Sequence, residues 1–190
     1  MKFFSTLIGQ KFLMAVSGVC LSVFLLMHLI NNLTLFLGPD VFNMMVGTLE
    51  SVKPLIRIIE FFLLVVFLTH VINAIKLTIG NQKANPKKYM GKEATSSLSS
   101  RTMIVSGLAV LVFFVIHLRY IWYTYQQHLF IGNETYYDVI LRNQLGYLGH
   151  TPTSIFYIIA ILFIAFHLHH GFQSAFKTFG VLKKSKWGIV

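Results

Sequence analysis

Histidine side chains recur inside the most apolar stretches of this 190-residue sequence. An ionisable group is costly to place in hydrocarbon, so histidines in such stretches are candidates for function. The residues concerned are His28, His70 and His117, each alone in its stretch, and the group His167, His169 and His170. A lone membrane histidine most often joins two helices by a hydrogen bond, but a histidine in each of four stretches indicates a shared role.

The positions of these histidines define two levels across a membrane. His28 and His117 lie 17 and 16 residues after the basic residue that precedes each stretch, which is about 25 Å along a helix that rises 1.5 Å per residue. His70 and His167 lie in stretches that run the opposite way, 13 and 14 residues from the outer ends. The sequence therefore predicts an outer pair, His28 with His117, and an inner pair, His70 with His167.

Two histidines at one depth on facing helices can bind a flat metal macrocycle between them. Bis-histidine ligation saturates haem iron and suits electron transfer rather than oxygen chemistry. Zinc would usually require three or four ligands around one point. A proton relay usually includes several buried acids, and Glu60 is the only acid well inside an apolar stretch. The pattern favours two haem b groups, with a histidine-relay transporter as the alternative from another class.

The other two histidines of the last stretch have different expected roles. His170 lies one turn nearer the cytoplasm than His167, so His170 and Arg101 are candidate contacts for haem propionates. His169 points about 200° away from His167, because each helical residue turns by about 100°. We expect His169 to face a neighbouring helix or lipid head groups.

Four apolar stretches are each long enough to cross a membrane. They cover residues 12–37, 55–79, 102–126 and 153–178, and each exceeds the roughly 20 residues that span the hydrocarbon core as a helix. The composition agrees, since 55% of the residues are hydrophobic and only 12% are charged. The sequence therefore predicts an all-α integral membrane bundle that forms a single domain over residues 1–190, and Pro152 marks the start of its fourth span.

The net charge of +10 is arranged as a topology signal. Twelve of the sixteen lysines and arginines fall on the side of the N-terminus, which places that side in the cytoplasm. Because these residues stand between apolar stretches, a nucleic-acid partner is not expected. Lipid head groups explain most of this charge, and an acidic docking surface or haem propionates are further candidates. The single cysteine, Cys20, excludes disulfides and iron–sulfur ligation by this chain.

The chain contains an internal repeat. Residues 16–29 and 105–118 align without gaps, and seven of fourteen positions are identical, including a Ser-Gly pair and the histidine ten residues after that glycine. Residues 69–74 match 166–171 more weakly. We expect two helix pairs in which small residues either let a porphyrin approach the backbone or form ordinary helix contacts. These residues are Ser17, Gly18, Ser106, Gly107, Ala74 and Gly171.

Polar groups near the outer histidine level are candidates for a quinone site. They are Glu60, Asn31 and Asn32. Glu60 is ten residues before His70 and three after Arg57, so it could carry quinone protons or pair with Arg57 on the same helix face.

Four segments resemble one membrane-protein family. They are IGQKFLMAVSG before the first span, HLINNLTLF after His28, SSRTM at the third span and FHLHHGFQSAF in the fourth. On these segments the chain resembles, essentially from end to end, the single-chain two-haem cytochrome b subunit of succinate:quinone oxidoreductases, the succinate dehydrogenases and fumarate reductases. The most specific feature is His167 followed by Gly171 and then Gln-Ser-Ala-Phe.

The resemblance implies that this chain anchors a flavoprotein subunit and an iron–sulfur subunit in a bacterial cytoplasmic membrane. Electrons would pass through the inner haem and then the outer haem to a quinone, of the menaquinone type in this family. The chain would be a non-catalytic electron-transfer subunit that serves either direction of the succinate–fumarate reaction. The family has a fifth helix, which here would follow Val190. The runner-up is the bis-histidine cytochrome b anchor of a hydrogenase or formate dehydrogenase.

Overall fold

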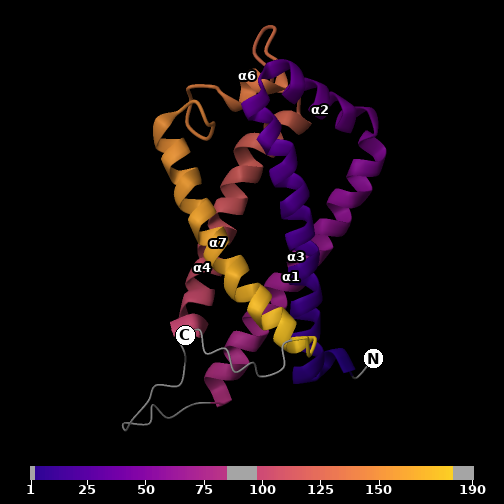
Figure 1. The fold of residues 1–190 in the computed structure, drawn as a ribbon, viewed down its shortest axis with the longest axis vertical. Helices are drawn as coiled ribbons and strands as arrows, with labels where there is room; N and C mark the ends of the chain where they lie inside the picture. Colours follow the sequence, from indigo (N-terminus) through magenta and orange to yellow (C-terminus); the bar gives the residue numbers. More distant parts are fainter. Residues whose placement is uncertain (1–2, 85–97, 182–190) are drawn as a thin grey trace.

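Four long helices run the length of the molecule (Figure 1). The computed structural model describes residues 3–84 and 98–181, and it contains no strand within those ranges. The long helices are α1 (Leu7–Leu33), α3 (Lys53–Ala84), α4 (Leu98–His117) and α7 (Thr151–Thr178). The short elements are η1 (Phe3–Ser5), η2 (Thr34–Leu37), α2 (Pro39–Ser51), the π-helix η3 (Leu118–Trp122), α5 (Tyr123–Gln126) and α6 (Tyr136–Ile140).

The prediction of an all-α membrane bundle is confirmed. Four helical segments are long and apolar enough to cross a membrane, namely Leu7–Leu37, Lys53–Gly80, Thr102–Gln126 and Thr151–Thr178. Their bounds agree with the predicted spans to within a few residues, and the first begins five residues earlier than predicted. Large apolar side chains along these helices are widely exposed on the outside of the bundle, as expected for a surface that faces lipid. The chain is an integral, multi-pass membrane protein.

Local sequence signals account for several helix ends. The side chain of Thr6 accepts a hydrogen bond from the backbone N–H of Gly9 and caps the start of α1. Gly38 has a φ of +95°, which favours glycine, and it turns the chain between η2 and α2. Pro39 and Pro152 lie in the first turns of α2 and α7, where a missing N–H costs nothing.

The long helices pack in a particular order. The extensive contacts among the described residues join α1 to α3, α4 to α7, and α1 to α7. The start of α1 and the end of α7 meet at one end of the molecule, where the rings of Phe12 and Phe179 are 6.0 Å apart. The two ends of the described chain therefore lie on the same side of the bundle.

A folded cap closes the opposite end of the bundle, where α2 and α6 lie in Figure 1. Phe42 and Val46 of α2 are buried against Ile140 of α6, and Leu35 and Leu148 pack around them. No feature of the sequence had predicted this cap. Its apolar core depends on contacts between α2 and a segment nearly a hundred residues later in the chain.

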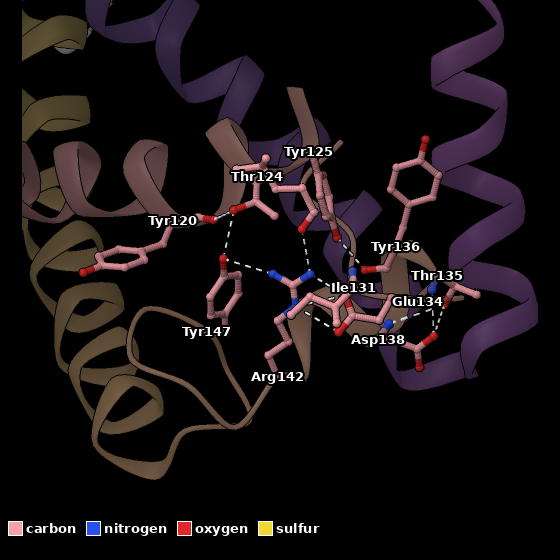
Figure 2. A network of polar contacts seen from close by, with 11 residues as sticks. Tyr120, Thr124, Tyr125, Ile131, Glu134, Thr135, Tyr136, Asp138, Arg142 and Tyr147 are labelled. Atoms are coloured by element: carbon pink, nitrogen blue, oxygen red, sulfur yellow. Dashed lines mark hydrogen bonds and ion pairs between the residues drawn. The ribbon is translucent and has the colours of Figure 1, made fainter. Parts of the chain in front are cut away.

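Arg142 holds the polar side of this cap together (Figure 2). Its guanidinium binds the carboxylate of Glu134 through more than one nitrogen and donates to the backbone oxygen of Leu129 at 2.8 Å and to the Tyr147 hydroxyl at 3.3 Å. The Tyr147 hydroxyl is also 2.9 Å from the hydroxyl of Thr124 in α5. These bonds fasten the loop that follows α5 to the outer end of the third span.

Candidate functional site

The imidazole rings of His28 in α1 and His117 in α4 lie next to each other. Their centroids are 5.7 Å apart and their planes are nearly perpendicular, at 86°. A metal ion with an imidazole nitrogen about 2 Å away on each side would place the two ring centroids about 6 Å apart. The separation of His28 and His117 is compatible with two imidazoles that would bind one metal ion.

The rings of His70 in α3 and His167 in α7 form a second pair of the same kind. Their centroids are 6.3 Å apart and their planes are inclined at 74°. The described residues contain no group of three or more histidine, cysteine or acidic side chains that could hold a metal ion. The candidate donor sets are therefore two pairs of imidazoles, each drawn from two different spans.

The helices that share a histidine pair are not the helices that pack most closely. The extensive contacts join α1 to α3, α4 to α7 and α1 to α7, whereas the histidine pairs connect α1 with α4 and α3 with α7. Each pair therefore reaches across the bundle from one half of the internal repeat to the other.

Serine hydroxyls lie against both inner histidines. The Ser17 Oγ is 3.1 Å from Nδ1 of His70, and the Ser106 Oγ is 3.3 Å from Nδ1 of His167. Ser17 and Ser106 occupy equivalent positions of the repeat, and both are buried. In each half, the serine of the first helix contacts the histidine of the second helix. A hydrogen bond at Nδ1 leaves Nε2 as the nitrogen available to a metal.

The glycines that follow these serines make room for the same imidazoles. A Cβ atom added to Gly18 would lie 3.4 Å from Cε1 of His70, and one added to Gly107 would lie 3.3 Å from Cε1 of His167. Gly171, by contrast, has nothing within 4 Å of such an atom. The Ser-Gly pairs, for which a porphyrin contact was one expectation, thus receive a histidine side chain.

Tyr157 of α7 is a neighbour of the outer pair that sequence analysis missed. Its hydroxyl is 3.3 Å from Nδ1 of His117, and its ring is 6.1 Å from the histidine ring. A sequence signal for it exists, because Tyr157 precedes His167 by ten residues just as Glu60 precedes His70. The two aligned positions carry different polar groups at the outer level.

Phenylalanine rings support the outer pair from within the same helices. Phe24 stacks on His28 with centroids 5.6 Å apart, and Phe113 stacks on His117 at 5.7 Å. Both contacts join residues four apart, which lie on one face of a helix. They restrict the rotation of the two imidazoles.

The π-helix η3 begins immediately after His117 and changes the direction of the residues that follow. His117 contacts α1 and α7, whereas Trp122, five residues later, donates from its indole nitrogen to the Glu60 carboxylate of α3 at 3.0 Å. Single π turns inside α-helices are frequent at functional sites. Because of this turn, the third span contacts both the outer histidine pair and the Glu60 carboxylate.

Glu60 is paired with Arg57, which was one of its two expected roles. The ion pair has an N–O distance of 2.7 Å, and Arg57 also binds the side chain of Gln126. With the Trp122 bond, the Glu60 carboxylate joins α3 to the outer end of the third span. Its side chain keeps 29% of its surface exposed, so it also remains open to further partners.

The two asparagines beyond His28 are placed differently. The Asn32 amide donates to the backbone oxygen of His28 at 2.8 Å. The Oδ1 of Asn31 is buried and has no hydrogen-bond partner among the described residues. A buried oxygen without a donor is costly, so this Asn31 oxygen stays a candidate acceptor for a bound group.

The remaining candidates lie near the inner end. The ring of His170 is half-buried and 5.3 Å from that of His169, which is exposed and whose Nε2 lies 3.3 Å from the side-chain nitrogen of Gln173. The backbone of Arg101 belongs to α4, but its side chain lies outside the described part of the chain. The suggested propionate contacts of His170 and Arg101 stay predictions.

Comparison with known proteins gives one match. The family model described as the succinate dehydrogenase/fumarate reductase transmembrane subunit matches residues 78–188, which is more than half of the chain. No curated protein matches the chain, and no solved structure matches it. The matched region begins at the end of α3 and includes His117, His167 and both helices of the second half of the repeat.

Proposed function

Because the chain belongs to the family of succinate dehydrogenase/fumarate reductase transmembrane subunits, we propose that it is a two-haem cytochrome b anchor that passes electrons between an iron–sulfur subunit and a membrane quinone. The single observation that carries this proposal is the two imidazole pairs, each from two spans and each with ring centroids about as far apart as two ligands of one metal ion require.

His28 and His117 would hold the iron of the outer haem b, and His70 and His167 that of the inner one. A haem with two histidine ligands, when bound, exchanges one electron at a time and has no open position for oxygen. The chain's own residues orient the ligands, since Ser17, Ser106 and Tyr157 each contact an Nδ1 atom. The donor chemistry thus fits the group.

The two ends of the bundle would meet different redox partners. The basic residues gathered on the side of the chain termini support a cytoplasmic N-terminus, in a bacterial cytoplasmic membrane, with the iron–sulfur and flavoprotein subunits bound on that side. Lys11, Lys76 and Lys177 are lysines at this end whose side chains the structure describes. The chain would take no part in the chemistry of succinate or fumarate.

A quinone, of the menaquinone type in our proposal, would bind near the outer pair. Asn31 supplies a buried oxygen without a donor, and Glu60 supplies a partly exposed carboxylate held by Arg57 and Trp122. Together they offer an acceptor and a carboxylate at the outer level. Asn32 lies in the same region, where its amide donates a hydrogen bond to the His28 backbone oxygen.

The test is a haem count and a reduced-minus-oxidised spectrum of the complex that is isolated by means of a tag on this chain. We expect two haems per chain by pyridine haemochrome, loss of one in His28→Ala or His117→Ala, and loss of the other in His70→Ala or His167→Ala. His169→Ala is the matched control, because this exposed histidine lies two residues from His167, and it should keep both haems.

Two results would contradict the proposal. A wild-type chain without a haem α-band would leave the histidine-relay transporter as the better explanation. A haem-containing chain that co-purifies with a hydrogenase or formate dehydrogenase, and with no flavoprotein of the succinate type, would assign it to another respiratory complex.

A further inference from the structure

We infer that Ser17 and Ser106 are positioning residues for the inner histidine pair: each serine oxygen accepts the Nδ1–H of one histidine and leaves its Nε2 free to bind iron. This inference rests on the proposed function. It assigns a role to the Ser-Gly pairs of the repeat.

Each serine hydroxyl has a second partner, a backbone carbonyl, that can take its proton. Ser17 Oγ donates to the backbone oxygen of Met14 at 3.1 Å, and Ser106 Oγ donates to that of Met103 at 3.2 Å. A carbonyl oxygen can only accept, and a hydroxyl has one proton. When Nε2 of His70 or His167 binds a metal, the neutral imidazole carries its proton on Nδ1, and the serine lone pair accepts that proton while the hydroxyl proton goes to the carbonyl.

Both contacts are buried and reinforced. Only 5% of Ser17 and 3% of Ser106 is exposed, so water does not compete strongly for the hydroxyls. Gly18 and Gly107 give the imidazoles space beside the backbone, with clearances of 3.4 and 3.3 Å to an added Cβ atom. The arrangement occurs twice in equivalent positions, on two different helix pairs.

The two histidine pairs differ in the group that contacts Nδ1. At the outer level the Nδ1 of His117 meets Tyr157, a phenol whose hydroxyl has no carbonyl fixing its proton among the described contacts. An acceptor at Nδ1 raises the basicity of a histidine ligand and stabilises the higher charge on its metal. The serines should therefore lower the midpoint potential of the inner haem and leave the outer haem unaffected.

The experiment compares Ser17→Ala and Ser106→Ala with wild type in the purified complex, by potentiometric titration of both haems and by EPR of the ferric state. We expect the inner midpoint potential to rise by up to about 59 mV, which corresponds to a tenfold change in a one-electron equilibrium. The outer potential should not change. Ser22→Ala is the matched control, because Ser22 is on the same helix but, among the described contacts, its hydroxyl bonds the Gly18 backbone and no histidine.

Threonine variants test whether the hydroxyl acceptor, rather than the size of the side chain, determines the inner midpoint potential. A threonine oxygen in a helix can bond the same preceding carbonyl, so Ser17→Thr and Ser106→Thr should keep the wild-type inner potential. If an alanine variant loses the inner haem altogether, retention of that haem by the threonine variant supports the inference and its loss contradicts it. Unchanged potentials in both alanine variants would overturn the inference while leaving the haem count intact. A wild-type complex without haem would instead refute the proposed function.

Discussion

Gly107 and Gly171 are both helical glycines near the fourth span's histidines, but their surroundings predict opposite effects of a methyl group. Gly→Ala in a helix interior stabilises by up to about 1 kcal/mol when nothing opposes it. Gly171 is open, so Gly171→Ala should raise the melting temperature in detergent. In Gly107→Ala, the new Cβ would lie 3.3 Å from His167 and should cancel this gain. An equal increase in both variants would show that His167 does not lie against Gly107.

Residue depth could be predicted from the sequence, but the neighbours of each residue could not. Counting along the spans gave the two levels, because the rise per residue is fixed, and the structure brings His28 to His117 and His70 to His167. The contact between Ser17 and His70 depends on how two helices are rotated about their axes. That rotation is set by packing over the whole bundle, and no local pattern encodes it.

The secondary-structure elements were likewise predictable only where they do not depend on distant partners. The spans were predictable because a long apolar stretch has one stable form in a membrane. The π turn after His117 and the cap built from α2 and α6 were not, since both depend on partners distant in sequence, namely Glu60 and the core formed by Phe42 and Ile140.

The cap should weaken in acid. Hydrogen bonds from Arg142 and from the Ile131 backbone hold the pKa of the Glu134 carboxyl below its ordinary value, and bonds from the backbone and hydroxyl of Thr135 do the same for the pKa of Asp138. Folding thus favours the ionised carboxylates. Their contribution is complete above the unfolded pKa values, about 3.9 to 4.3, and is lost as the pH falls through the lower folded values.

This dependence can be measured by thermal unfolding in detergent between about pH 7 and pH 3, a range that brackets the ordinary carboxyl values. We expect the wild type to lose more stability on acidification than Glu134→Gln, which is already deprived of the Arg142 ion pair at neutral pH. An identical pH dependence in the two proteins would contradict the role of Glu134.

At the scale of the whole molecule, the proposed orientation makes a labelling prediction. In a Cys20→Ser background, a cysteine replacing the exposed Asn133 of the cap should react with an impermeant maleimide on intact cells. A cysteine replacing the exposed Lys177 should react only after the membrane is opened. The reverse result would place the N-terminus outside and the basic residues with it.

The crossing of the histidine pairs between the halves of the repeat also sets the order in which the sites are completed. A membrane protein is synthesised from its N-terminus, and the first two spans contain one member of each pair. The third span supplies His117 and completes the outer pair, whereas the inner pair lacks His167 until the fourth span has been made. During biosynthesis the outer site is therefore complete first, and a chain that stops before α7 would contain only one of the two.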